Sequence, residues 1–411
     1  MPPEDPPSEP RGEPSLGELA RAWGRIGCVG FGGPPAHIAL LRELCVDRRR
    51  WLTSTQFEHA IAATNLLPGP ASTQLAIYCA WRLRGLRGAL VGGLCFIVPG
   101  LAAIIALGAL FLSHAPPTWL RGAGMGAGAA VAAVAVRAGL AVAGPIWTSA
   151  RGRARRGRVL AYGLLGGVAA ALSGPWLVLV LFTCGLVELA DRRLDRAGAN
   201  AHTWLAPAVL RVGGRPLGRG TSPGFLLAAA AQTGGTLALA WTALKVGALA
   251  FGGGFVIVPL MQADAVNTYH WMSHAQFLDA VALGQLTPGP LTQTVAVVGY
   301  AAGGLPGALL AAVVAFAPSF SFILIGAARF ERLLVDARVR AFLAGAAPAA
   351  AGAIIGAAVP LTGALSETWQ YAVLGCAAVA LLALGRSIVA TLLLAGCAGI
   401  LAALLGAPII S

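Results

Sequence analysis

Two apolar stretches in this sequence are too long and too poor in charge for a soluble protein. Residues 89–112 and 388–409 each exceed the roughly 20 apolar residues with which a helix crosses a bilayer. Lipid offers no hydrogen bonds to the backbone, so a segment of this kind must be helical. The composition agrees, because 57% of the 411 residues are apolar and only 11% are charged. We therefore predict an all-α polytopic membrane protein.

The net charge of +13 comes from arginines that lie in short runs between the apolar segments. A nucleic-acid-binding protein gathers its positive charge on one face or in one domain, so we predict no nucleic-acid partner. The pattern is typical of the positive-inside rule. We expect the lipid bilayer to surround the chain, with the basic loops at 82–88, 150–158, 191–222 and 329–340 in the cytoplasm.

The sequence also contains an internal duplication. One shift places FGG at 31–33 on FGG at 251–253, and PGP at 68–70 on PGP at 288–290. A tryptophan between the two motifs coincides as well, and one residue is missing from the second copy after PGP. Chance matches between apolar segments rarely keep such motifs in one register, so we predict two homologous halves.

The two halves are expected to have inverted orientations in the membrane. The loop that follows PGP is basic in the first half, at 82–88, and uncharged in the second, at 300–306. The second half carries an extra apolar segment at 224–240, which would serve as a linking helix, so we predict about 10–12 membrane segments. The predicted boundaries are a disordered tail at 1–15, a first repeat at 16–190, a basic cytoplasmic linker at 191–222 and an inverted second repeat at 223–411.

Each half begins with two apolar segments that glycine and proline interrupt. Glycine allows conformations that end a helix and proline removes a backbone donor, so each segment is predicted to be two half-helices that meet inside the bilayer. The sequence does not decide whether these segments are re-entrant hairpins or complete broken spans. The alternative is that the breaks only permit a kink or close packing.

Discontinuous helices in inverted repeats are typical of secondary transporters, whose substrate site lies between the repeats. The N-terminal ends of the half-helices favour an anion, because their N–H groups and positive dipole ends are exposed there. Arg25 and Lys245, the only lysine in the chain, precede the two FGG motifs at equivalent positions. We predict that both cations serve the substrate; snorkelling, or pairing with a carboxylate such as Glu43 or Asp264, is the alternative.

Polar and backbone groups around the four breaks complete the predicted substrate site. Hydroxyl and amide groups there would replace the hydration shell of an oxyanion, and His37 is as well explained by a structural role. Glu43, Asp264 and Asp279 are the candidates for ion coupling. The remaining predicted substrate residues are Gly32, Gly33, Asn65, Pro68, Gly69, Ser72, Thr73 and Gln74 in the first half, and Gly252, Gly253, Gln285, Thr287, Pro288, Gly289 and Thr292 in the second.

At these motifs the chain resembles the chromate ion transporter family of the two-domain type. The first half carries FGGPPAHIALL, RRRWL and ATNLLPGPASTQLAI, and the second carries FGGGFVIVP and FLDAVALGQLTPGP. The resemblance implies a multi-pass protein of the bacterial inner membrane that exports chromate and confers chromate resistance. Sulfate, which has the shape and charge of chromate, is the implied competitor.

The residues alone indicate an anion carrier, and the choice of chromate comes from the resemblance. Import or exchange of sulfate or another small anion is the alternative function. A membrane-embedded reductase is a third hypothesis, but no haem, flavin, iron–sulfur or metal motif is present, so we predict no cofactor, no metal and no catalysis. A homodimer is one assembly that the sequence allows.

Overall fold

The computed structural model describes residues 13–67, 69–113, 116–172, 177–198, 235–250, 254–326 and 336–408. Every regular element in that part of the chain is a helix, which confirms the predicted all-α class. The first half comprises α1 (Leu16–Val29), α2 (Pro34–Arg42), the π-helix η1 (Glu43–Arg48), α3 (Ser54–Leu66), α4 (Ala71–Phe111), α5 (Thr118–Ser149), α6 (Arg153–Leu172) and α7 (Leu177–Gly198).

The second half repeats this order of elements. It comprises α9 (Thr236–Leu249), α10 (Ile257–Gln262), the π-helix η4 (Ala263–Thr268), α11 (His274–Leu286), the 3₁₀-helix η5 (Leu291–Gln293), α12 (Thr294–Gly326), α14 (Ala337–Gly356), α15 (Ala358–Gly363), α16 (Thr368–Ala378), the π-helix η7 (Val379–Ala383) and α17 (Ile388–Leu404).

The duplication extends to details of the backbone. Arg50 and His270 occupy equivalent positions after the two π-helices, and both have a φ of 52°, which is uncommon outside glycine. The helices that follow them, α3 and α11, each begin with a capping box, built on Thr53 and Ser273. The two sequences therefore fold into the same local structure, as the repeat predicts.

The interrupted segments form re-entrant hairpins rather than complete spans. Helices α1 and α3 have 14 and 13 residues, so each rises only about 20 Å, short of the roughly 30 Å hydrocarbon core. Their outer ends return to one face. Arg84, at the end of the second hairpin, pairs with Glu13 at 3.3 Å, and the charge of Arg49, after the first hairpin, acts on Glu18.

Four of the described helical stretches are long and apolar enough to cross a membrane: Ala71–Phe111, Thr118–Ser149, Leu291–Gly326 and Ala337–Gly363. Helices α4 and α12 each combine a hairpin leg with a longer segment. They bend at Gly85 and Gly304, whose φ values of 58° and 61° an L-residue rarely adopts. Gly85 in α4 and Gly304 in α12 thus let each helix turn from the hairpin leg into the longer segment.

Repeat-equivalent helices α4 and α12 pack against each other in opposite directions. A Cβ atom at Gly93 would lie 2.5 Å from the ring of Phe320, whereas one at Gly108, further along α4, would lie 3.2 Å from Val297, near the start of α12. Equivalent elements that run antiparallel across the membrane place the two halves in opposite orientations. These contacts show that α4 and α12 run antiparallel, as the predicted inversion requires.

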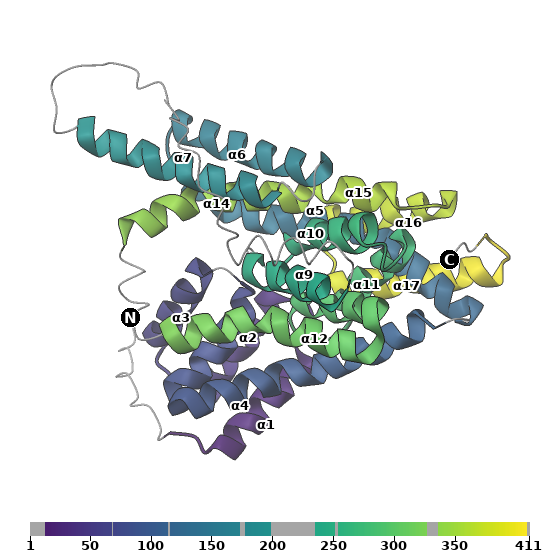
Figure 1. Cartoon of the computed structure of the whole chain (residues 1–411), viewed down its shortest axis with the longest axis horizontal. Helices are drawn as coiled ribbons and strands as arrows, with labels where there is room; N and C mark the ends of the chain where they lie inside the picture. Colours follow the sequence, from purple (N-terminus) through teal and green to yellow (C-terminus); the bar gives the residue numbers. More distant parts are fainter. Residues whose placement is uncertain are drawn as a thin grey trace, which may run out of the picture.

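The two halves interlock within one chain. In Figure 1, α6 and α7 of the first half lie beside α14 of the second half, while α16 and α17 lie along α5. Small residues allow the close approach, since a side chain at Gly352 or Gly356 would clash with the backbone of Gly163 or Gly167. Each half therefore completes the packing of the other.

Two of the predicted boundaries meet described residues. Helix α7 runs to Gly198, so residues 191–198 of the predicted linker are helical, and residues 199–222 lie outside the described part of the chain. Residues 13–15 of the predicted tail are described, and Ser15 caps α1. Residues 1–12 lie outside that description.

Candidate functional site

The tips of hairpins from opposite halves meet at their breaks. The N–H of Gly289, in the second PGP motif, donates to the carbonyl of Gly30 in the first FGG loop, at 3.0 Å. In the reciprocal contact, a Cβ atom at Gly69 would lie 3.4 Å from the carbonyl oxygen of Gly247. The Pro288 carbonyl packs so closely on Gly100 of α4 that any side chain there would clash with it. The second PGP loop therefore meets the first FGG loop, and the first PGP loop lies beside α9 of the other half.

A chain of hydrogen bonds connects the two halves through His37. Its Nε2 lies 2.8 Å from the Gly30 carbonyl, which only accepts, so Nε2 carries the proton and Nδ1 accepts from the Ser72 hydroxyl at 3.2 Å. The Gly30 carbonyl also accepts from Gly289. His37 is fully buried and has both nitrogens satisfied, so its role in this conformation is to tie the start of α4 to the second PGP loop.

Two helix N-termini begin at this meeting point without a side-chain cap. Helix α4 begins after Pro70, and η5 with α12 begins after Pro290; neither proline has a side-chain oxygen to offer the first N–H groups. By contrast, α1, α3 and α11, which start at the outer ends of the hairpins, have capping boxes. The interior N-termini thus lack a side-chain cap, as α9 also does at its outer end, and present a positive dipole end that favours an anion.

The two N-termini have matching side chains. Gly69 and Gly289 have φ values of 124° and 105°, and the amides of Gln74 and Gln293 fold back over them, within 2.5 and 3.0 Å of a Cβ atom placed there. The second half has one residue fewer here, and the tighter 3₁₀ turn of η5 compensates for it. This places Thr292 in the position of Thr73.

Buried polar atoms without partners surround these N-termini. Thr73 and Thr292 have no solvent-exposed surface, and their Oγ1 atoms have no hydrogen-bond partner among the described residues. Such groups are costly unless a ligand or water satisfies them. Other atoms of this kind in the second half are Gln285 Nε2, Gln293 Oε1, Thr294 Oγ1 and Ser319 Oγ.

Other predicted substrate residues have structural roles or lie outside the description. Gly32 and Gly33, with φ values of 99° and 73°, form the first break, and Gly33 precedes α2. Thr287 is satisfied, because it donates to Leu283 and accepts from Gln293, which also donates to Pro288. Residues Pro68, Gly252 and Gly253, and the side chain of Asn65, lie outside the described part of the chain.

The two predicted cations are not equivalent in the structure. Lys245 Nζ pairs with Asp264 Oδ2 at 2.5 Å, and the Thr242 hydroxyl donates to the same oxygen at 2.8 Å. This pair joins the two legs of the first hairpin in the second half. Arg25 is exposed on α1 and makes no ion pair within the described residues. The pairing that the sequence left as an alternative thus holds Lys245 in this conformation.

Breaking the pair from one side is expected to destabilise the protein. Lys245→Met leaves the buried Asp264 carboxylate uncompensated, and we expect a loss of up to about 3 kcal/mol, the low end for a buried pair, because the Lys245 side chain is 23% exposed. Adding Asp264→Leu, which copies Leu44 of the first half, should restore stability. Thermal unfolding in detergent measures both; an unchanged Tm in the single variant would contradict a stabilising pair.

The three predicted coupling residues have different surroundings. Glu43 is exposed and pairs with Arg48 at 2.6 Å. Asp264 is engaged by Lys245. Asp279 makes no ion pair or hydrogen bond within the described residues, and its Oδ1 faces Gly124 of α5. The structure therefore distinguishes one unpaired carboxyl group from two paired ones.

Two further polar residues lie in the interior: Ser319, which the sequence prediction missed, and Arg137, which stands out in the sequence as the lone charge of an apolar span but is not among the predicted substrate residues. Ser319 is fully buried with an unpaired hydroxyl, and it is the repeat mate of Gly100, since each follows the matching proline, Pro318 or Pro99. A polar residue at that position in an apolar helix was a usable signal. Arg137 donates to the carbonyl of Leu381, in the π-helix η7, where the α-helical hydrogen-bond pattern is interrupted.

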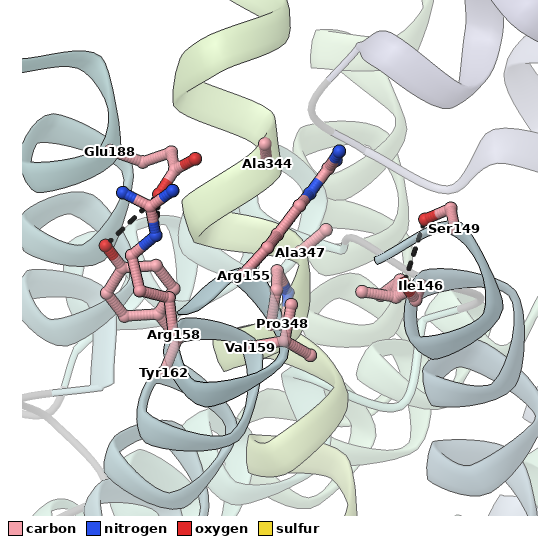
Figure 2. A pocket seen from close by; sticks show the side chains of 10 residues that line it. All are labelled: Ile146, Ser149, Arg155, Arg158, Val159, Tyr162, Glu188, Ala344, Ala347 and Pro348. Carbon is pink, nitrogen blue, oxygen red and sulfur yellow. Dashed lines mark hydrogen bonds and ion pairs between the residues drawn. The ribbon is translucent and has the colours of Figure 1, made fainter. Parts of the chain in front are cut away.

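A separate cavity of about 130 Å³ lies between α5, α6, α7 and α14 (Figure 2). Arg155 and Arg158 line it, but Arg158 is held by Glu188, at 3.7 Å, and by Asp191. Tyr162 donates to the same Glu188 carboxylate at 3.4 Å. Arg158 is therefore already matched by carboxylates, whereas Arg155 forms no ion pair within the described residues.

Inverted repeats, re-entrant hairpins and uncapped interior helix ends define a multi-pass membrane protein of the transporter class. The chain belongs to the chromate transporter family, which matches residues 17–189 and 237–400. No solved structure matches it.

Relatives resemble the chain over most of its length. It is 30% identical to a chromate transport protein of Cupriavidus metallidurans, over 93% of this chain and 92% of the relative. It is 32% identical to a chromate transport protein of Pseudomonas aeruginosa, over 83% and 79%. An uncharacterized transporter of Methanocaldococcus jannaschii is 27% identical over 79% of each chain.

Proposed function

We propose that this protein exports chromate across the bacterial inner membrane and so confers chromate resistance. Two relatives that align over most of the chain are named as chromate transport proteins. Chromate is a tetrahedral dianion, which needs several hydrogen-bond donors arranged around it and no metal or cofactor. The proposed site supplies such donors from both halves of the molecule.

The observation that supports the proposal best is the matched pair of interior helix ends. Each has an N-terminus without a side-chain cap after PGP and a buried threonine, Thr73 or Thr292, whose hydroxyl has no partner in the part of the chain that the structure describes. The bonds through Ser72, His37, Gly30 and Gly289 hold the two ends together. An anion between them would receive hydrogen bonds from both halves, each favoured by a helix dipole.

Lys245 and Arg25 have less direct roles in this proposal. Lys245 Nζ is bound to Asp264, so it acts on the substrate only if that pair opens. Arg25, exposed on α1, would attract anions rather than hold them. The face with Arg48, Arg49, Arg84 and Arg87 is cytoplasmic by the positive-inside rule.

Transport by inside-out vesicles tests the proposal. We expect vesicles that contain the protein to accumulate chromate, control vesicles not to do so, and cells that express it to survive higher chromate concentrations. Sulfate in excess should compete, because it has the same shape and charge. Sulfate uptake into right-side-out vesicles, with no chromate uptake in inside-out vesicles and no protection of cells, would instead show an importer.

A further inference from the structure

Asp279 lies at a contact between the two halves, where it is half-buried. It is on α11, in the second hairpin of the second half, and faces α5 of the first half. A Cβ atom at Gly124 would lie 2.7 Å from Asp279 Oδ1 and 2.8 Å from the ring of Phe111. Gly128, one turn further along α5, faces Leu278. The absence of side chains at these two glycines makes room for the carboxyl group.

No charged group compensates Asp279 within the described residues. Helix α11 packs against α4, α5, α10, α12, α17, η4 and η5, and none of their titratable groups forms an ion pair or hydrogen bond with Asp279. Those groups are Tyr78, Cys79, Arg82, Arg84, Arg87 and Cys95 on α4, Arg121 and Arg137 on α5, Tyr300 on α12, Cys397 on α17 and Asp264 on η4, with His274 on α11 itself.

A carboxylate in such surroundings is unfavourable, and a proton removes its charge. Ionised groups that leave water without a partner become neutral rather than remain charged. A metal cation would need several oxygen ligands, whereas the carboxyl group of Asp279 lies against the two glycines of α5, Gly124 and Gly128, which have no side-chain oxygen to offer. Packing of α11 against α5 therefore favours the protonated form of Asp279.

The first half shows the same hairpin in a different position. Leu278 and Ala282 on the α5-facing side of α11 are only 3% and 2% exposed. Their repeat mates on α3, Glu58 and Ala62, are exposed, and α3 makes only slight contact with α14, the mate of α5. The hairpin of α11 is thus closed on α5, whereas the hairpin of α3 is open relative to α14.

Inverted repeats exchange such positions during transport, because the protein faces opposite sides of the membrane when its halves swap conformations. In the exchanged conformation α11 would leave α5, as α3 has left α14, and Asp279 would face water. Its repeat mate His59 is exposed on α3 in the present conformation. Water would stabilise the ionised carboxylate there.

We propose that Asp279 is a proton-binding site that controls closure of α11 on α5: the carboxylate binds one proton when the hairpin closes and releases it when the hairpin opens. The inference rests on the proposed transport function at one point: closure of α11 on α5 is taken as a step of the transport cycle. Between the pH at which the open form ionises and the higher pH at which the closed form would ionise, each pH unit should shift the equilibrium away from closure about tenfold, since closure binds one proton.

Two measurements on the full-length protein and its Asp279→Asn variant test this proposal. Infrared spectra of the two proteins at neutral pH are subtracted from each other. The difference should contain a protonated carboxyl band that the wild type has and Asp279→Asn lacks. In proteoliposomes, chromate–chromate exchange by the wild type should slow as the pH rises on the side of the membrane toward which the α11 hairpin opens. The variant is a neutral mimic of the protonated acid and should lose this pH dependence. Glu43→Gln, at a paired and exposed carboxylate, is the matched control for both.

The outcomes separate this proposal from the proposed function. The absence of the infrared band, or the same pH dependence in Asp279→Asn as in the wild type, overturns the role of Asp279 even if chromate is transported. If the wild type exchanges no chromate, the proposed substrate is wrong, and the infrared band alone decides whether Asp279 carries a proton. A band together with a lost pH dependence supports the proposal.

Discussion

Replacing Thr73 and Thr292 with valine together is expected to abolish chromate transport while the protein still folds. Valine has the shape of threonine, and the lost hydroxyls have no partner among the described residues, so the substitutions remove no hydrogen bond found there. A hydrogen bond from a hydroxyl to an anion contributes about 1.5–3 kcal/mol, so each substitution should weaken binding about tenfold or more and the pair about a hundredfold. Initial rates of chromate uptake in proteoliposomes measure the loss.

Thr64→Val is the matched control for this experiment. Thr64 is also buried, but its hydroxyl donates to Ala60 within its own helix, so its loss should leave chromate affinity unchanged. Unaltered transport in the double variant would mean that the two hydroxyls do not face the substrate. Equal losses in the double variant and the control would point to packing as the cause.

A cross-link between α11 and α5 is expected to stop transport reversibly. A Cβ atom at Gly128 would lie 3.1 Å from Cβ of Leu278, close to the roughly 3.5–4.5 Å of a disulfide. Cysteines at these two positions should therefore join in the closed conformation. If α11 must leave α5 in each cycle, the oxidised protein should have almost no activity.

The cross-linking experiment has its control within the same protein. It uses a background without the native cysteines 28, 45, 79, 95, 184, 376 and 397, which are free thiols, and reduction should restore the rate to that of the uncrosslinked variant. Full transport by the oxidised protein would contradict the movement of α11. Either single cysteine variant should be indifferent to oxidant.

The repeat and its inversion were predictable because they rest on local rules. Glycine and proline at the FGG and PGP motifs end helices wherever they occur, so the positions of the breaks follow from the sequence. The basic loop at 82–88 and its uncharged mate at 300–306 gave the inversion. The choice between hairpin and broken span was not predictable, because it depends on contacts such as that of Arg84 with Glu13.

The candidate site was predicted in part. The sequence placed Ser72, Thr73, Gln74 and Thr292 together, because hydroxyl and amide side chains after PGP are unusual in apolar segments. It treated Arg25 and Lys245 as equivalent, but their surroundings differ: Asp264, which pairs with Lys245, has a leucine as its repeat mate. The packing of α6 and α7 of the first half against α14 of the second half depends on long-range contacts, so the local sequence does not predict it.

The most direct measurement of the central claim is an experimental structure of the protein with bound chromate, in which anomalous scattering locates chromium. We predict one peak within hydrogen-bonding reach of Thr73 and Thr292, between the N-termini of α4 and η5. A peak in the cavity of Arg155 and Arg158 (Figure 2), with none at the hairpin tips, would contradict the site proposed for the anion.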